Sequence, residues 1–275
     1  MITVRLPPRT LFATVSMAIR RCGRQQFRVP DKRFPYPPPS VIIGGVNGPA
    51  RISTLALRHA LPHPLATEQW AQVRPLIDGR DVLGEIHPGG VASCSRREWF
   101  GPAEEWPLAA LEEPRQVELS NNDCYTGCCG GTFVTIHRQG DRVVWSSWRN
   151  TNDIRVPVPA DVHFDAAQYD AELARAVADT SWEEPVDTVA RLVTQELADS
   201  NWFERWDCVM DRVELEREVP EGVEVYFSRR RDAGAHRSDF CFDLPVTRHE
   251  PAGEQARRII ALITAGDPRE TAEPL

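Results

Sequence analysis

Three cysteines lie within six positions of the segment Asn122–Gly131, whose sequence is NDCYTGCCGG. They are Cys124, Cys128 and Cys129. Thiols this close together suit three purposes: binding a metal ion, attacking a substrate, or packing as small apolar groups. The residues around the segment, which we call the cysteine loop, bear on which of these applies.

A zinc site is one alternative for the cysteine loop. Structural zinc takes about four ligands, commonly from paired cysteines separated by two to four residues. Cys124 and Cys128 form one such pair, and Cys129 adds a third sulfur. A further ligand would have to come from elsewhere, from Cys94, His87 or His137. Zinc on Cys124, Cys128 and Cys129 is therefore the cofactor that the sequence leaves open.

A nucleophilic cysteine is the second alternative. Its thiolate needs a neighbouring positive charge, and a base must lie within hydrogen-bond reach. Arg149 would supply the charge, and His137 or His163 would supply the base. The catalytic candidates are Cys124, Cys128, Cys129 and His137.

Packing is the third alternative. A free cysteine behaves as a small hydrophobe and is among the most frequently buried residues. Gly130 and Gly131 would let the chain approach Trp148 closely. The sequence favours packing for at least two of the three thiols.

A β-hairpin is predicted directly after the cysteine loop by the sequence GTFVTIHRQGDRVVWSSWRN. A two-residue turn at Gln139–Gly140 would place Ile136 opposite Val143 and Val134 opposite Trp145, on one apolar face. The same register sets Gly131 beside Trp148 and Cys129 beside Asn150.

The predicted register brings the cysteine loop to the segment at 149–153, RNTND. We therefore expect a shared site there, with the ligand-binding residues Trp148, Arg149, Asn152 and Asp153. Trp145 and Trp148 are three positions apart, so they cannot share a face of a regular strand. One of them should be exposed or should contact a partner.

The second half of the chain predicts helices packed on a sheet. Asp165 and Gln168 form a capping box for a helix, and apolar residues at helical spacing predict a second helix from Pro185. Strands are expected at 117–119, 212–218, 223–228 and 240–244, with a last helix at 254–264. In the first half we expect strands at 4–6, 11–19, 26–29 and 41–43, and helices at 52–60 and 67–77.

These elements indicate an α+β protein. Its C-terminal half would pack two or three helices on a mostly antiparallel sheet, and a smaller strand-rich part would precede it. We expect an N-terminal region at 1–114, a C-terminal domain at 115–265 and a loose tail at 266–275.

Composition indicates a soluble cytoplasmic protein. The chain of 275 residues is 41% hydrophobic and 26% charged, and no apolar run approaches the roughly 20 residues that span a bilayer. Seven cysteines, an odd number without an export signal, favour reduced thiols. The first 34 residues carry +7 and the remainder −15, so the acidic body argues against a nucleic-acid partner.

The stretch Leu119–Asn150, with DCYTGCCGG, VTI, GDRVVW and WRN, and the following FDAAQYDAELARA resemble hypothetical proteins of high-GC bacteria that are uncharacterised. The similarity covers the second half of the chain and implies no activity.

Two functions follow from the residues. Five of the eight tryptophans lie between 145 and 206, in an acidic half of the chain. This pattern predicts a binding protein of the inhibitor or immunity kind, which captures a protein partner through a Trp-rich acidic surface. The alternative is a thiol- or metal-dependent enzyme acting on a small anionic substrate, with Arg149 holding the negative charge.

Overall fold

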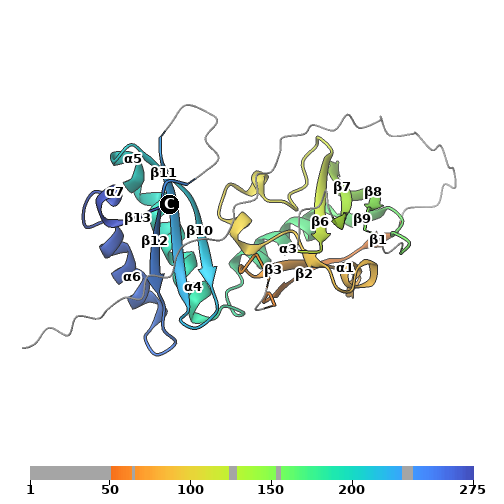
Figure 1. Cartoon of the computed structure of the whole chain (residues 1–275). Helices are drawn as coiled ribbons and strands as arrows, with labels where there is room; N and C mark the ends of the chain where they lie inside the picture. The colour runs from red at the N-terminus through yellow and green to blue at the C-terminus, as the bar shows by residue number, and fades with distance from the viewer. Residues whose placement is uncertain (1–50, 64–65, 124–128, 153–155, 231–237) are drawn as a thin grey trace, which may run out of the picture. The chain divides into compact units, whose positions relative to one another are not determined.

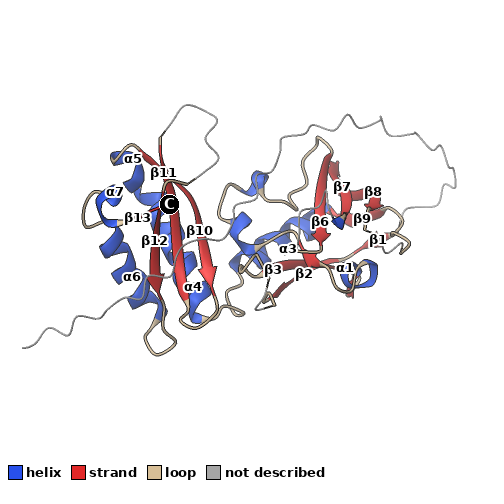
Figure 2. Cartoon of the chain, in the orientation of Figure 1, coloured by secondary structure: helices blue, strands red, loops and turns tan. Residues whose placement is uncertain are grey.

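The computed structural model describes residues 51–63, 66–123, 129–152, 156–230 and 238–275 (Figure 1). The fold is α+β with mostly antiparallel sheets, as the sequence predicts, and the longer helices follow residue 165 (Figure 2). The basic segment at 1–34 and the strands expected before residue 50 lie outside the described residues. None of the helices in the described part of the chain is long and apolar enough to cross a membrane.

A six-stranded sheet carries the candidate site. Its order is β1-β9-β8-β7-β6-β5, and only β1 and β9 run parallel. The strands are β1 Ile52–Ser53, β5 Val91–Ala92, β6 Arg115–Asn121, β7 Gly131–Gln139, β8 Arg142–Asn150 and β9 Val162–Asp165. The strands β5 and β6 pair across residue 114, where the sequence suggested a domain boundary. The predicted division of the chain into two domains at residue 114 stays a prediction.

Helix α3, Ala166–Ala178, covers the core of this sheet. Half of the predicted capping box forms, because the Asp165 carboxylate accepts a hydrogen bond from the Gln168 backbone N–H at 2.9 Å. The Gln168 side chain bonds instead to the backbone of Leu55. The helix buries Tyr169 completely against Trp145 and Phe164. The Tyr169 hydroxyl accepts from the Trp145 indole N–H at 3.2 Å and donates to the Leu108 carbonyl at 2.6 Å.

The helices predicted at 52–60 and 67–77 are wrong. Those residues contribute β1 and two strands of a three-stranded sheet, β2 Leu55–Ala60 and β3 Gln72–Ile77, which is completed by β4 Arg80–Asp81. Apolar residues in these segments also fit a period of two, with Leu55 and Leu57 buried on one face of β2. Pairing between β2 and β3 decides in favour of strands. The short helix α1, Val82–Ile86, follows, and the 3₁₀ turns Arg96–Trp99 and Ala103–Glu105 come before β6.

The last part of the chain forms a four-stranded antiparallel sheet with two long helices. The strands, in order, are β10 Cys208–Glu216, β11 Gly222–Arg229, β12 Phe240–Pro245 and β13 Glu273–Pro274. The helices α4 Pro185–Ser200 and α6 Ala252–Ile263 bury their apolar faces in one cluster with these strands, and α5 Trp202–Arg205 joins them. The loose tail expected at 266–275 is wrong, because α7 Pro268–Thr271 and β13 form there and β13 pairs with β12.

His59, in β2, is held neutral by its surroundings. Its ring stacks on Trp182 with centroids 4.7 Å apart and an interplanar angle of 17°. Burial, and then the positive charge of Arg96, lower the pKa of His59 from 6.5 to about 4. The carboxylates of Asp179 and Glu183 oppose this shift, whereas Arg175 adds to it.

The lowered pKa of His59 predicts a loss of stability in acid. The unfolded chain binds a proton at this position below about pH 6.5, whereas the folded chain does so only below about pH 4. Stability should therefore fall as the pH drops through this window, by about 1–2 kcal/mol once partial exposure is allowed for. Urea denaturation at pH 7 and pH 4.5 measures the loss. His59→Gln should show a smaller loss, and an equal loss in both proteins would contradict the assignment.

Candidate functional site

The β7–β8 hairpin turns one residue later than predicted. Gln139 pairs with Arg142, so that the turn is Gly140–Asp141, and Ile136 lies opposite Trp145. Gly140 has φ +62°, a conformation that glycine accepts at the first position of a tight turn. The predicted cross-strand partners are therefore wrong, although Val134, Ile136, Val143 and Trp145 are all buried on one face as expected.

A β-bulge shifts the register further along the same hairpin. The pairing slips between Phe133 and Thr135, and opposite this point Ser147 adopts φ +52°. The extra residue breaks the alternation of side chains, so Trp145 and Trp148 both face the core, with ring centroids 5.8 Å apart. The expectation that one of these tryptophans is exposed or meets a partner is wrong for this physical reason.

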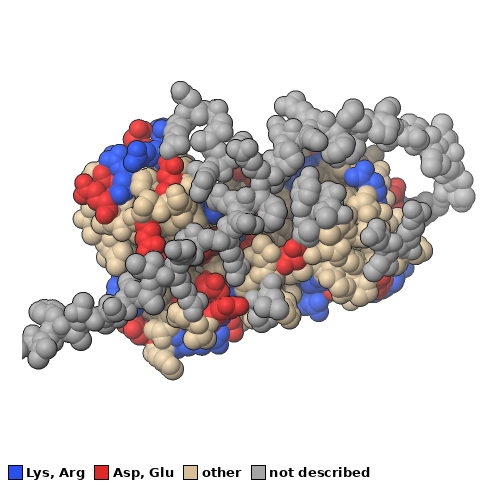
Figure 3. All heavy atoms as spheres, viewed as in Figure 1, with Lys and Arg blue, Asp and Glu red and all other residues tan. Residues whose placement is uncertain are grey.

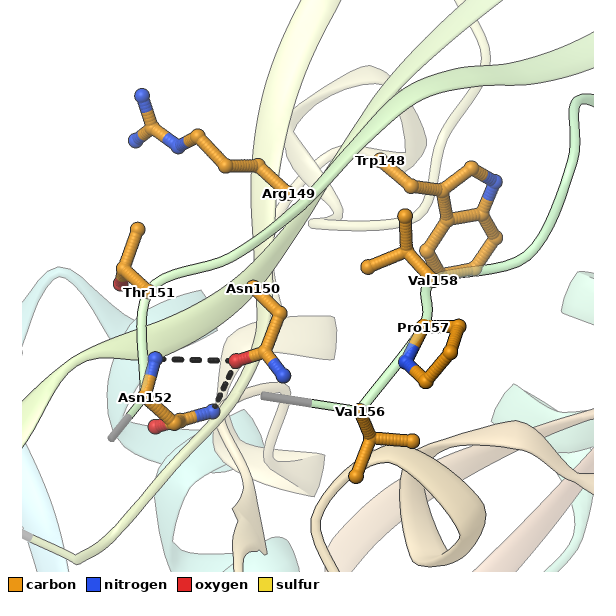
Figure 4. A pocket seen from close by; sticks show the side chains of 8 residues that line it. All are labelled: Trp148, Arg149, Asn150, Thr151, Asn152, Val156, Pro157 and Val158. Carbon is orange, nitrogen blue, oxygen red and sulfur yellow. Dashed lines mark hydrogen bonds between the residues drawn. The ribbon is translucent and has the colours of Figure 1, made fainter. Parts of the chain in front are cut away.

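Near the bulge, β8 also stops pairing with the segment that leads into β9. The β8–β9 ladder ends at the pair Trp145 and Val162. Beyond that pair, residues 156–161 form no strand. A pocket of about 490 Å³ lies in the gap, lined by the β8 end, Trp148–Asn152, and by Val156–Val158 (Figure 4). We call this space the β8 pocket.

Two asparagines form the polar end of the β8 pocket. The Asn150 Oδ1 atom accepts hydrogen bonds from the backbone N–H of Asn152 at 3.0 Å and from its Nδ2 at 2.9 Å (Figure 4). Asn152 is only 6% exposed, and its Oδ1 atom has no hydrogen-bond partner among the described residues.

Trp148 supplies the apolar wall and a second unpartnered group. Its side chain is 9% exposed, and the indole Nε1 is buried without an acceptor within the part of the chain that is described. Two buried hydroxyls in neighbouring strands share this condition, Ser120 in β6 and Thr132 in β7. Thr132 pairs with both Ser120 and Asn150, so a row of polar side chains crosses three strands at this end of the sheet.

Arg149 takes the opposite face of β8. In Figure 4 its side chain extends away from Trp148 and from the wall formed by Pro157 and Val158. Its guanidinium carbon lies 4.9 Å from the centroid of the Phe133 ring, in a cation–π contact with its cross-strand partner. Arg149 thus borders the β8 pocket while its charge lies on the other side of the strand.

The cysteine loop is only partly described. Cys124, Cys128 and Asp153 lie outside the described residues, whereas Cys129 is half-buried. The end of the loop meets the segment after β8, because Thr151 donates its backbone N–H to the Gly131 carbonyl at 2.9 Å. Gly130 has φ +77°, and a Cβ there would overlap the Thr151 carbonyl. Close approach at this position requires glycine.

His137, one of the bases expected for a reactive thiol, lies far along β7 from Cys129. His137 lies opposite Val144, six residues along β7 from Gly131, which corresponds to roughly 20 Å. Cys94 is buried, and its sulfur accepts from the Trp99 indole N–H at 3.0 Å. Burial raises the pKa of the Cys94 thiol. Over the described residues, no group of three His, Cys, Asp or Glu side chains could hold a metal ion.

Comparisons with known proteins found no matching family model, no matching curated protein and no matching solved structure. The candidate site therefore rests on its own geometry.

Several residues of the β8 pocket escaped the sequence analysis. The predicted ligand-binding residues Trp148, Arg149 and Asn152 do line one pocket. The facing wall, Val156–Val158, carried a signal in its alternating sequence VPVP, which is typical of an extended segment. Ser120 and Thr132 gave none, because isolated hydroxyl residues in a strand are common.

The bulge at Ser147 can be tested by a pair of substitutions. Ser147→Gly should leave stability unchanged or raise it by up to about 1 kcal/mol, because glycine adopts φ +52° without strain. Ser147→Val should lower stability by about 1–3 kcal/mol, since a β-branched residue resists this conformation. Urea denaturation of both variants measures the difference. Equal stability of the two variants would show that residue 147 does not hold the left-handed conformation.

Proposed function

We propose that this chain is a binding protein and that the β8 pocket is its ligand site. One observation carries the proposal: a pocket of about 490 Å³ combines an apolar lining, from Trp148 and Val156–Val158, with a hydrogen-bonded pair of asparagines, Asn150 and Asn152.

The composition of the pocket supports the same function. Ligand sites are mostly apolar and contain a small number of polar groups that fix orientation. Here Trp148 and Val156–Val158 provide the apolar surface, and the Asn150–Asn152 pair provides the polar end. The volume of about 490 Å³ falls in the range of small-molecule pockets.

Backbone irregularities gather at this end of the sheet. A bulge interrupts the β6–β7 ladder between Glu118 and Ser120, and a second interrupts β7–β8 opposite Ser147. Asp123, in the following turn, also has a positive φ, of 53°. Bulges and strained residues are enriched beside functional sites, where they redirect side chains.

The β8 pocket accounts for binding better than a tryptophan-rich surface does. Trp148 is buried, Trp182 is stacked on His59, and Trp202 and Trp206 are half-buried and contact each other at 5.9 Å. On the face shown in Figure 3, acidic and basic side chains both occur among larger areas of other residues. Capture of a protein partner, the cytoplasmic location and a zinc or thiol role for the cysteine loop stay predictions.

A fragment screen tests the pocket with a matched pair of variants. Val158→Glu places a charge at the pocket wall, whereas Val209→Glu does so on β10, and the two valines are 37% and 41% exposed. Fragments detected by ligand-observed NMR should bind the wild type and Val209→Glu, and should bind Val158→Glu at least roughly tenfold more weakly.

Thermal unfolding provides the control that both variants are folded. The proposal fails if no fragment binds the wild type, or if every fragment binds Val158→Glu and Val209→Glu equally well.

A further inference from the structure

We infer that the two hydrophobic cores of this chain are joined by a hinge at residues 179–184, and that Trp70 is the anchor that holds the joint closed. The joint opens as one unit while both cores stay folded. This inference goes beyond the proposed function, because the described lining of the β8 pocket belongs to the part of the chain before the hinge.

The helices and strands divide into two groups at residue 179. The strands β1–β9 and the helices α1 and α3 come before it, and buried residues between 55 and 176 form the first core. The helices α4–α7 and the strands β10–β13 follow, and buried residues between 186 and 263 form the second core together with Trp70. The closest packing between elements stays within one group, as in α3 on β2 and α4 on α6.

The connection between the groups is short and irregular. Residues 179–184 form neither helix nor strand, and they lead from α3 to α4. The Trp182 indole N–H donates to the Asp179 carbonyl at 2.8 Å, and its ring stacks on His59 of β2. Loop residues between packed bodies absorb the changes in backbone angle when those bodies move. Residues 179–184 are placed to serve as such a hinge.

Trp70 crosses from the first group into the second core. It lies in the loop between β2 and β3, yet its side chain is 1% exposed and packs in the cluster formed with α4 and β10–β12. The Phe100 ring meets the Trp70 ring edge to face, with centroids 5.4 Å apart, and packs against the same core. A buried tryptophan removes a large apolar area from water. Trp70 therefore supplies the main apolar contact of the joint.

The edge of a sheet receives the polar end of Trp70. The strand β10 is the first in the order of the four-stranded sheet, and an edge strand presents backbone groups that its own ladder does not use. The Val213 carbonyl of β10 accepts a hydrogen bond from the Trp70 indole N–H at 3.0 Å. The anchor is thus fixed in orientation as well as buried.

Polar contacts surround the anchor. The Arg217 Nε atom donates to the Gln69 carbonyl at 2.8 Å. Arg97 pairs with Glu68 at 3.2 Å and with Glu214 at 2.6 Å, and all three side chains are partly exposed. Ion pairs of this kind contribute little to stability. A polar interface with one large apolar anchor permits relative motion of the two bodies that it joins.

Hydrogen exchange at two indoles tests the joint in the wild-type protein. The Trp70 N–H is released when the joint opens, whereas the Trp145 N–H, bonded to the Tyr169 hydroxyl, is released only when the first core unfolds. In protein labelled with ¹⁵N on the indoles, the Trp70 signal should exchange at least roughly tenfold faster than the Trp145 signal. Its rate should change little with low concentrations of urea, because opening exposes little surface.

Either of two results contradicts an opening joint. Equal exchange rates at Trp70 and Trp145 would show that the whole chain unfolds as one body. A Trp70 rate that rises as steeply with urea as global unfolding does would show that the second core must unfold to release it. Trp70→Phe assigns the Trp70 signal.

Trp70→Ala tests the anchor by scanning calorimetry. The wild type should unfold in one transition, whereas Trp70→Ala should unfold its two cores separately, so that its van't Hoff enthalpy falls well below its calorimetric enthalpy. Trp202→Ala is the matched control, because Trp202 packs against the second core from α5 without crossing the joint. This variant should unfold at a lower temperature in one transition.

The calorimetric outcomes decide the role of Trp70. Equal van't Hoff and calorimetric enthalpies for Trp70→Ala, or separate transitions already in the wild type, overturn it. Separate transitions in Trp202→Ala as well would show that Trp70 has no special part in the coupling. If Trp70→Ala does not fold, Trp70→Phe takes its place, since it keeps an apolar ring and loses only the bond to Val213.

Discussion

The left-handed conformation of Ser147 is the constraint on which the arrangement of the candidate site depends. A single residue with φ +52° inserts one extra position into β8 and shifts its register against β7. As a result Trp148 joins Trp145 on the core side. The ladder with β9 ends close to the bulge, at Trp145 and Val162. The β8 pocket opens where the two segments no longer pair. The bulge therefore sets which side chains of β8 face the pocket.

The two neighbouring tryptophans show how the sheet changes in character along β8. The Trp145 indole N–H is satisfied by the Tyr169 hydroxyl, which in turn donates to the Leu108 carbonyl. Trp148, three positions later, buries the same N–H without an acceptor among the described residues. Helix α3 and the aromatic cluster around Tyr169 make the first region a dense core. The second region contains the buried hydroxyls of Ser120 and Thr132, which find no hydrogen-bond partner in the described part of the chain.

The sequence predicts those parts of the fold that depend on local chemistry. The Asp165 cap, the apolar faces of α3, α4 and α6, and the strands β6 to β8 and β10 to β12 follow from capping residues and periodicity. The segments at 52–60 and 67–77 fitted two periods, and long-range pairing of β2 with β3 decided between them. The bulge could not be predicted, because serine has no preference for a positive φ that would mark position 147. The predicted hairpin turn is one residue too early, because Gly140 takes the first position of the turn and not the second.

This bulge explains why residues that the sequence placed at one site do not all lie on one face of β8. In a regular strand, Arg149 would share a face with Trp145, since residues four positions apart point the same way. Its guanidinium would then favour an anionic ligand. The extra residue exchanges the two faces beyond Ser147, because a shift of one position moves every later side chain to the opposite side. Trp148 and Asn150 take the place of Arg149, which contacts Phe133 instead. The bulge therefore places the Trp148 ring on the pocket side of β8 and the Arg149 guanidinium on the other side, against Phe133.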